Sequence, residues 1–371
     1  MVRSLLPHGG ADRYTAADMR IVVIGGGISG LATAWQLVKR LRATSQPHEL
    51  TLLEASARLG GTIHTSSRSG FSVENGPNGF LDSKPDTVDL VEELGLGDRV
   101  LVSSDAARRR FVLIDGELVE LPTSAGAFLK SKLLSVGGRM RVMREPWVRR
   151  GGTPDETVAE FARRRLGKQV LDRLIDPFVS GIFAGDPARL SVAAAFPRLV
   201  ELEETYGSLI KASRQLKRER GDQVGTAGPG GKLTSFVSGM QELVDALGLA
   251  LGDSVRLNER VEDLRRSGER WVVSTASGRM ITDVDIVVLA VPAYAAAKIL
   301  GQLSAEAASA LADIPYAAAS VVAFGYHVDQ VAMPLDGFGF LVPQEEERPI
   351  LGCLWSSSVF PGERAPPDHV L

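Results

Sequence analysis

Cysteine and histidine are scarce in this sequence of 371 residues. Its one cysteine, Cys353, excludes an internal disulfide, and its five histidines are too scattered to form a cluster of metal ligands. A chain without these features is typical of a reducing compartment. We therefore expect no metal and a cytoplasmic location.

An excess of basic charge is also missing. The 42 lysines and arginines are outnumbered by 45 aspartates and glutamates, which gives a net charge of −3. This balance excludes the overall positive charge of a nucleic-acid-binding protein, so any positive patch must be local. The hydrophobic share of 44% and the charged share of 23% are those of a folded chain, and the length predicts two or three domains.

An export signal and a membrane span are both absent from the pattern. Residues 1–19 mix glycine, proline and charges without an apolar core, so we expect a disordered extension. The longest uncharged stretch, 21–38, has 18 residues, but Gly25, Gly26 and Gly27 interrupt it. A strand, a turn and a helix explain this stretch better than a membrane helix.

A glycine-rich turn near the amino end predicts a dinucleotide site. The apolar run 21–24 leads directly into Gly25-Gly26-Gly27-Ile28-Ser29-Gly30, and apolar residues then recur at helical spacing. In such a turn the first glycine permits the bend, the second lets the backbone approach a pyrophosphate, and the third lets the helix lie close to the strand. A second predicted strand, 49–53, ends in Glu54, whose carboxylate suits a ribose hydroxyl. The plainer alternative is an ordinary strand–helix–strand unit with an incidental glutamate.

Two further segments resemble the FAD-dependent amine oxidase and desaturase superfamily. They read Glu54-Ala55-Ser56-Ala57-Arg58-Leu59-Gly60-Gly61-Thr62 and Glu74-Asn75-Gly76-Pro77-Asn78-Gly79-Phe80. In that superfamily these segments wrap the flavin, so the resemblance implies FAD rather than NAD and places Arg58 beside a phosphate. It also implies a backbone contact from Val261 to the adenine. The residues expected to bind FAD are Gly25, Gly26, Gly27, Ile28, Ser29, Gly30, Glu54, Ala55, Arg58, Gly60, Gly61, Thr62, Gly76, Pro77, Asn78, Gly79 and Val261.

Caps and turns organise the middle of the chain. Asp115-Gly116 predicts the turn of a short hairpin. Thr153-Pro154-Asp155-Glu156 matches a capping box, so we expect a helix to begin there. Residues 178–187 are rich in helix-stop residues, and Ser191 opens another apolar segment.

As a set, five segments resemble the porphyrinogen oxidases, a flavoenzyme family of late heme synthesis. They are RRRFVLIDGELVELP, PDETVAEFARRRLG, GIFAGDPARLS, DGFGFLVP and PILGCLWSS, and the resemblance runs from about Arg20 to Leu371. It implies the six-electron oxidation of protoporphyrinogen IX to protoporphyrin IX, with FAD as cofactor and molecular oxygen as acceptor. Oxidation of coproporphyrinogen III to coproporphyrin III stays open as the alternative.

The resemblance also identifies substrate residues. Arg110 matches the arginine that pairs with a propionate of the porphyrinogen, a role that suits its forked donors. Phe338, Gly339 and Leu341 match the apolar clamp on the tetrapyrrole, and Gly181 matches a small residue beside the substrate. Without the resemblance, Arg110 is a surface arginine and the other four are turn or core residues.

The predicted fold is α/β, with a discontinuous Rossmann-like FAD-binding domain. Residues 20–95 and 228–300 form that domain, in which 286–291 is a buried parallel strand. Residues 96–123, 213–227 and 301–371 form a mixed-sheet substrate domain, and 124–212 form a helical domain that faces a membrane.

A local basic segment supports the membrane assignment. Between 125 and 150, seven basic residues and one acid, Glu145, are interleaved with apolar residues. Such a segment predicts docking on an anionic bilayer, whereas the alternative is a solvated helix face over the core. The expected location is therefore the cytoplasm, with peripheral attachment to a membrane.

The chemistry is assigned to the flavin and not to a side chain. His64 and His327 are interpreted as ordinary histidines, so no general base is assigned. Two rival interpretations are another FAD amine oxidase or carotenoid desaturase and an inactive flavoprotein. The second arises because the family has a glycine-containing C-terminal segment, completing the flavin site, that these 371 residues lack. A homodimer is also compatible with the sequence.

Overall fold

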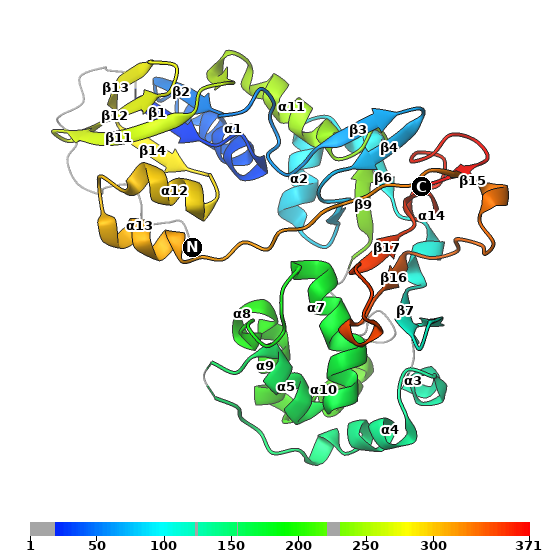
Figure 1. Cartoon of the computed structure of the whole chain (residues 1–371). Coiled ribbons are helices and arrows are strands. Elements are labelled where there is room, and N and C mark those ends of the chain that lie inside the picture. The colour runs from blue at the N-terminus through cyan, green and yellow to red at the C-terminus, as the bar shows by residue number, and fades with distance from the viewer. Residues whose placement is uncertain (1–18, 123–124, 154, 221–230) are drawn as a thin grey trace.

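The computed structural model describes residues 19–122, 125–153, 155–220 and 231–371. The predicted extension at 1–18 lies outside these residues, while Met19 already belongs to the first strand. Figure 1 shows a parallel sheet with its helices at one end of the molecule and a group of helices, α4 to α10, at the other. Small mixed sheets lie between the two ends.

A four-stranded parallel sheet forms the first end. Its order is β10 (Val255–Arg256), β2 (His48–Leu53), β1 (Met19–Ile24) and β14 (Ile286–Leu289). Strands from residues 19–53 and from residues 255–289 therefore share one sheet, as the predicted α/β class requires. The predicted domain boundaries stay a prediction. The helices beside it are α1 (Ile28–Ala43), α11 (Gln241–Leu251), α12 (Ala293–Leu300) and α13 (Ala305–Ala312).

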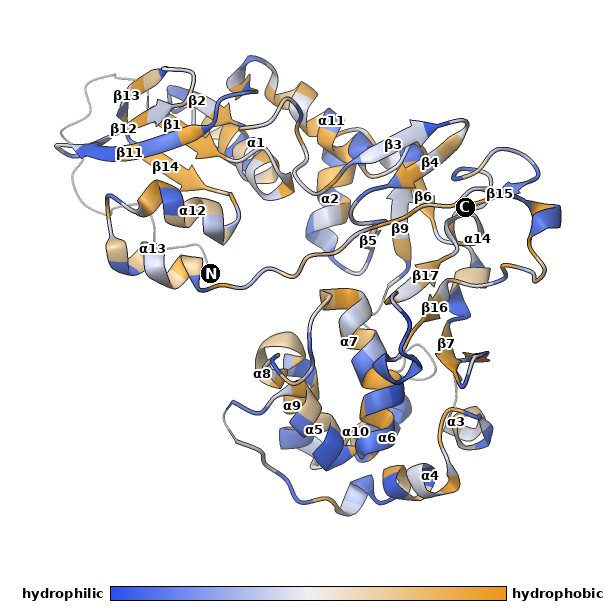
Figure 2. Ribbon diagram, viewed as in Figure 1, coloured by the Kyte–Doolittle hydropathy of each residue, from blue (hydrophilic) through white to orange (hydrophobic). Residues whose placement is uncertain are grey.

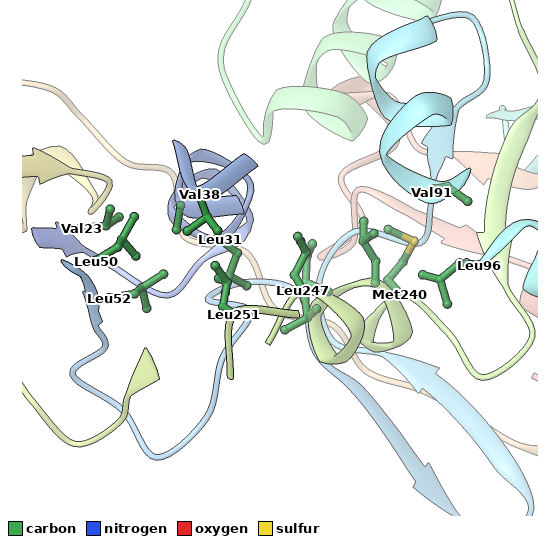
Figure 3. Close-up of a cluster of buried hydrophobic side chains, with 14 of the residues drawn as sticks. Val23, Leu31, Val38, Leu50, Leu52, Val91, Leu96, Met240, Leu247 and Leu251 are labelled. Carbon is green, nitrogen blue, oxygen red and sulfur yellow. The ribbon is translucent and has the colours of Figure 1, made fainter. Parts of the chain in front are cut away.

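The alternating side chains of β1 explain why this sheet is covered on both faces. Ile21 and Val23 point into a cluster formed with α1 and α11, part of which is drawn in Figure 3. Val22 and Ile24 point the other way, into a cluster with an antiparallel sheet. That sheet consists of β11 (Val261–Ser267), β12 (Arg270–Thr275) and β13 (Met280–Val284).

One expectation about this sheet was too strong. We predicted a fully buried strand over 286–291, but β14 pairs only with β1 among the described strands and Ile286 is 37% exposed. An apolar run indicates that the side chains of a strand pack against other elements. It does not distinguish an edge strand of a sheet from a central one.

Short strands connect the two ends. Two small sheets and helix α2 (Pro85–Glu93) lie next to the parallel sheet. One sheet pairs β3 (Thr65–Arg68) with β4 (Phe71–Glu74), and the other contains β5 (Phe80–Leu81), β6 (Val100–Val102) and β9 (Leu233–Phe236). Strand β9 lies between β5 and β6. It therefore joins a predicted FAD-domain strand to a predicted substrate-domain strand.

A second four-stranded sheet has the order β17-β16-β7-β8. Its members are β7 (Phe111–Ile114), β8 (Glu117–Glu120), β16 (Gly339–Leu341) and β17 (Gly352–Leu354). The hairpin β7–β8 turns at Asp115 and Gly116, both with positive φ (52° and 78°), as in a type I′ turn. This confirms the predicted Asp-Gly turn. Nearby lie α14 (Ser356–Val359) and the pair β15 (Tyr326–His327) and β18 (His369–Val370).

Helices make up the other end of the molecule. They are α3 (Ala125–Lys130), α4 (Val136–Met143), α5 (Val158–Arg165), α6 (Lys168–Val170), α7 (Asp176–Phe183), α8 (Val192–Ala195), α9 (Pro197–Tyr206) and α10 (Leu209–Arg220). As expected, Ser191 caps α8. Within the part of the chain that the structure describes, no helix combines the length and apolarity that crossing a bilayer requires.

Two sequence expectations for the helices were wrong. The predicted capping box at Thr153 is displaced by four residues, because Thr157 and Glu160 form the box and α5 starts at Val158. Glu156 is instead buried and bound by the Arg164 guanidinium, at 2.7 and 2.8 Å. The predicted boundary between 212 and 213 falls inside α10, because Ala212 and Leu216 are buried in one continuous helix.

Candidate functional site

The glycine turn has the close backbone contacts that the spacing predicted. Gly25 has a φ of 111°, and its N–H donates to the Leu53 carbonyl at 2.8 Å. A Cβ on Gly30 would lie 1.9 Å from the Gly25 carbonyl oxygen, so only glycine allows α1 to approach the strand. Gly27 precedes α1, and no side chain caps the N–H groups of the first helical turn. Those N–H groups are free to meet an anion.

Glu54 lies against this turn. Its Oε2 accepts a hydrogen bond from the Gly26 N–H at 2.7 Å, and Oε1 accepts one from the Ser56 N–H at 2.8 Å. The backbone of Glu54 also receives the Glu259 N–H at 2.8 Å. Each carboxylate oxygen keeps a further acceptor position for a ribose hydroxyl. Glu54 therefore lies at the glycine turn, and its contact with a ribose hydroxyl stays a prediction.

The second glycine segment packs directly on the turn. The Gly60 N–H donates to the Gly26 carbonyl at 2.8 Å, and a Cβ on Gly61 would be 3.3 Å from the Gly27 Cα. Ala55 and Thr62 lie in the same segment. The Arg58 guanidinium donates to the carbonyls of Leu59, Gly61 and Ile63 at 2.6–3.1 Å, and its contact with a phosphate stays a prediction. Arg58 organises its own loop through these bonds.

The third segment lies against the second and against β9. A Cβ on Gly76 would be 1.9 Å from the Thr62 carbonyl oxygen, and one on Gly79 would be 2.4 Å from the Thr234 carbonyl oxygen. Pro77 and Asn78 form the link between these two glycines. The three segments thus pack backbone against backbone and form one continuous surface, here called the backbone cradle. This is the kind of surface that a dinucleotide requires.

Three buried charged groups beside the cradle were not foreseen. Glu74 is buried and accepts the Met240 N–H at 2.8 Å, at the start of α11. Arg364 is 2% exposed, lies 3.9 Å from Glu74, and donates to the Ser235 hydroxyl at 2.9 Å. Burial lowers the pKa of Arg364 below its usual value. No sequence signal marks Arg364, because a charged residue among prolines is typical of an exposed loop.

The third of these groups, Glu259, fixes the loop that precedes Val261. Its carboxylate accepts hydrogen bonds from Ser277 (2.6 Å), Arg279 (2.8 Å) and Thr275 (2.8 Å). These bonds lower its pKa to about 2, with Ser277 as the largest cause. Val261 itself is buried and begins β11. Val261 lies two residues beyond Glu259, whose N–H donates to the Glu54 carbonyl at 2.8 Å. The contact of Val261 with the adenine stays a prediction.

Arg110 and Phe338 lie together on the second sheet. The Arg110 guanidinium lies over the Phe338 ring, 5.1 Å from its centre. Its neighbour Arg109 is paired with Glu120 at 3.0 Å and with Asp336, whereas Arg110 has no acidic partner among the described residues. The Phe338 N–H donates to the Arg109 carbonyl at 2.8 Å, which fixes the two residues relative to each other. A free cation beside an aromatic face suits an acidic, flat ligand.

Gly181 and Leu341 form a second pair beside the first. A Cβ on Gly181 would lie 2.6 Å from Leu341 Cδ2, so α7 approaches β16 closely at this point. Gly339 has a φ of 135°, and a Cβ there would be 2.0 Å from the Cys353 carbonyl oxygen. The five predicted substrate residues therefore lie close together: Gly339 and Leu341 are on β16, Gly181 is on α7, and Arg110 and Phe338 directly precede β7 and β16. The contact of each with a substrate stays a prediction.

The two groups of residues share one apolar cluster. Leu233 of β9 lies within 3.1 Å of where a Gly79 Cβ would be, and it packs on the same buried cluster as Phe338. Two hollows, of about 710 and 430 Å³, lie elsewhere and include none of the predicted site residues. The candidate site is thus a pair of adjoining surfaces.

The basic segment exposes apolar side chains. Val136, Met140, Met143 and Trp147 are 52–81% exposed, whereas Leu133 and Leu134 belong to the core. Glu145, the one acid of the segment, is fully buried and paired with Arg165. Arg139 and Arg141 donate to backbone carbonyls, and Lys132 pairs with Glu117. Within the described residues, Lys130, Arg144, Arg149 and Arg150 have no acidic partner.

Comparison with known proteins gives a consistent result. Residues 28–371 match the family of flavin containing amine oxidoreductases. A chloroplastic protoporphyrinogen oxidase of Oryza sativa subsp. japonica is 35% identical over 100% of this chain and 72% of its own length. A coproporphyrinogen III oxidase of Bacillus subtilis is 32% identical over 92% of this chain and 74% of its own length.

Solved structures agree with the sequence relatives. A crystal structure from Exiguobacterium sp. 255-15, provisionally assigned as a protoporphyrinogen oxidase, has a TM-score of 0.77 at 26% identity over 96% of this chain and 76% of its own. A reduced UDP-galactopyranose mutase has a TM-score of 0.65 at 16% identity over 95% of this chain and 73% of its own, a likeness of fold alone.

Proposed function

The chain belongs to the flavin containing amine oxidoreductases, and on that premise we propose that it oxidises a porphyrinogen to the aromatic porphyrin. The observation that best supports this proposal is the position of the Arg110 guanidinium over the Phe338 ring. These two residues lie on a surface next to the backbone cradle expected to hold a dinucleotide. A porphyrinogen is a broad apolar molecule with carboxylate side chains. The Arg110 guanidinium would pair with a carboxylate of the substrate, and the Phe338 ring would pack against its macrocycle.

The cradle fits FAD. Glycines whose Cβ atoms would strike neighbouring backbone, an uncapped helix terminus and Glu54 at the turn are the features that a bound dinucleotide needs. When bound, FAD accepts the electrons of the oxidation in pairs. The residues expected to hold it are those of the glycine turn, Glu54, and the segments around Gly60 and Gly76.

The chain's own contribution is orientation. Arg110 holds a carboxylate at the edge of the second sheet, and Phe338 and Leu341 present an apolar surface to the ring system. Gly181 has no side chain, which lets α7 pack closely against Leu341. The ion pairs of Arg109 with Glu120 and Asp336 hold the backbone from which Arg110 extends. The described residues supply this geometry without a general base.

The substrate we propose is protoporphyrinogen IX, with molecular oxygen as acceptor. Three pairs of hydrogen atoms leave the substrate, and three molecules of oxygen become hydrogen peroxide. Coproporphyrinogen III is the second candidate, favoured by the 32% identity to the Bacillus subtilis enzyme. Both substrates carry propionates, so Arg110 serves either.

An anaerobic assay separates these candidates. The purified chain is supplied with FAD and then with each porphyrinogen, and absorbance near about 450 nm follows reduction of the flavin. We expect protoporphyrinogen to bleach the flavin with a higher second-order rate constant than coproporphyrinogen does. Bleaching by an amine or a carotenoid, with neither porphyrinogen active, would contradict the proposal. Bound flavin that no substrate bleaches would indicate an inactive flavoprotein.

We further propose that the basic surface, residues 130–150, docks on an anionic membrane from the cytoplasm. Exposed Met140 and Trp147 provide the apolar insertion, and Arg144 and Arg149 provide the attraction to headgroups. Sedimentation with vesicles tests this. Trp147→Ala should reduce binding, whereas Leu249→Ala, at an 85% exposed leucine elsewhere, should not. Binding that ignores both salt and anionic lipid would contradict the electrostatic part.

A further inference from the structure

Arg364 is one of two buried arginines among the described residues, and it lies between the two surfaces of the candidate site. The other buried arginine, Arg165, is paired with Glu145 among the helices at the far end. The Glu74 carboxylate lies 3.9 Å from the Arg364 guanidinium, beyond hydrogen-bonding distance. Because a buried charge without a directly bonded carboxylate costs stability, the stability of the fold is a weak explanation for a cation at this position.

On one side the Arg364 guanidinium binds strand β9. Its Nη2 donates to the Ser235 hydroxyl at 2.9 Å and to the Phe236 carbonyl at 3.2 Å, and its Nη1 donates to the Val237 carbonyl at 3.3 Å. The Arg364 carbonyl also accepts the Ser72 N–H of β4 at 3.1 Å. Since β9 pairs with β5 directly after the third glycine segment, these bonds attach Arg364 to the backbone cradle.

Glu74 links the same place to helix α11. Its Oε1 accepts the Met240 N–H at 2.8 Å, just before α11, and its Oε2 accepts the Thr65 hydroxyl at 2.8 Å. A Cβ on Gly239 would lie 2.6 Å from Glu74 Oε1, so the chain approaches this carboxylate closely through a glycine. Glu74 is also the first residue of the third glycine segment. Arg364 and Glu74 therefore stand where β4, β9 and α11 meet.

On the other side the Arg364 guanidinium contacts the substrate surface. It lies over the ring of Phe360, 4.9 Å from the ring centre. Phe360 is buried and shares an apolar cluster with Phe338. The Gly337 N–H donates to the Ser358 hydroxyl at 3.1 Å, which ties the same segment to the strand that carries Phe338. Figure 2 shows the strands β7, β16 and β17 of this surface as largely hydrophobic.

We propose that Arg364 is a positioning residue that locks the backbone cradle to the substrate surface and so fixes the separation of flavin and porphyrinogen. This inference rests on the function proposed above and deepens it. A guanidinium suits the role, because it holds five N–H donors in one rigid plane while its face packs on an aromatic ring. Among the described residues, no contact joins Arg364 to the glycine turn or to Arg110, so it acts through β9 and Phe360.

Anaerobic rapid mixing of the FAD-loaded chain with protoporphyrinogen IX separates rate from affinity. Arg364→Met should lower the limiting rate constant of flavin reduction about 10- to 100-fold, since a misplacement of about 1 Å costs about 100-fold. The half-saturating substrate concentration and the affinity for FAD should each change less than about threefold. Arg364→Lys should recover part of the rate, because it keeps the charge and some of the donors.

Two further variants keep the test independent of stability. Arg165→Met removes the other buried arginine, so it should lower the melting temperature and leave the limiting rate constant unchanged. Ser235→Ala removes one acceptor of Arg364 and keeps the cation, and it should slow reduction by a smaller factor than Arg364→Met. Reduction by dithionite, which needs no position on the protein, should be equally fast in all variants.

Hydrogen exchange tests the lock without any reaction. In Arg364→Met the amides of 72–76 and 233–237 should exchange at least about tenfold faster than in the parent chain. The amides of α1, at 28–43, should exchange as in the parent chain, and Arg165→Met should leave all of these amides unchanged.

Two results would overturn the inference. One is an unchanged limiting rate constant in Arg364→Met. The other is a loss of rate, affinity and melting temperature together, in Arg364→Met and Arg165→Met alike, which would make Arg364 a residue of the fold alone. If neither porphyrinogen reduces the flavin of the parent chain, the proposed function fails, and hydrogen exchange decides. Unchanged exchange at 233–237 in Arg364→Met would then overturn the inference as well.

Discussion

Gly27 is the position at which ligand binding is most cleanly separated from folding. A Cβ at Gly27 would have nothing within 4 Å, and the backbone there has a φ of −72° that any residue adopts. The fold therefore does not need a glycine at this place. If a pyrophosphate approaches the turn here, the ligand does need it. Gly27→Ala should consequently leave folding intact and weaken FAD.

The magnitudes follow from these contacts. Alanine at a compatible φ changes stability by about 1 kcal/mol or less. A methyl group between the helix terminus and a phosphate removes one charge-assisted hydrogen bond, worth about 1.5–3 kcal/mol. With 1.4 kcal/mol for each factor of ten, FAD should bind about 10- to 100-fold more weakly.

Gly30→Ala is the contrasting variant. Its Cβ would lie 1.9 Å from the Gly25 carbonyl oxygen, so helix α1 must move away from β1. Overpacking against backbone costs about 3 kcal/mol. This variant should melt at a lower temperature even without FAD.

Two measurements decide between these outcomes. Thermal unfolding without FAD reports folding, and titration followed by flavin fluorescence reports affinity. If Gly27→Ala binds FAD as tightly as the parent chain, the turn does not cradle the pyrophosphate and the reasoning fails. If Gly30→Ala keeps its melting temperature, the close approach of α1 to β1 does not contribute as argued.

Three further outcomes are expected. Arg110→Ala should raise KM about 10- to 100-fold through loss of one carboxylate contact, with kcat little changed. An unchanged KM in steady-state assays would show that Arg110 is a surface residue that does not contact the substrate. Arg165→Met should cost about 3–5 kcal/mol in denaturant unfolding, because it leaves Glu145 buried without its partner, both side chains being 0% exposed; a loss below about 1 kcal/mol would contradict this. Glu259→Gln should melt below the parent chain. Because the pKa of Glu259 falls from 4.5 to about 2 on folding, that difference should be complete above pH 4.5 and vanish toward pH 2; a difference independent of pH would exclude the carboxylate as its source.

The parts of the fold predicted from sequence are those set by local backbone chemistry. The turn at Gly25, the Asp115-Gly116 hairpin and the cap at Ser191 each depend on residues adjacent in the chain. A glycine that must adopt a positive φ, or a side chain that caps its own helix, leaves a pattern within six residues or so. The position of Glu54 was also predictable, since the spacing of a strand–helix–strand unit is nearly fixed.

The parts that sequence missed depend on partners far along the chain. Thr153 and Thr157 both precede a glutamate by three residues, and only the burial of Glu156 against Arg164 decides between them. The three carbonyls that the Arg58 guanidinium binds were not predicted either, although its phosphate contact stays a prediction. Local patterns describe which bonds a residue is able to make. Competition between partners decides which it makes.

The relation between the two halves of the site rests on β9. This strand pairs with β5 immediately after Gly79 on one side and with β6 on the other. Arg364 donates to its Ser235 hydroxyl and Phe236 carbonyl, so the carboxyl-terminal residues are bound to the same strand. A redox reaction between a bound flavin and a bound tetrapyrrole depends on a fixed separation, and a misplacement of about 1 Å costs about 100-fold in rate. A hydrogen-bonded strand shared by both surfaces sets that separation more rigidly than a hinge between domains would.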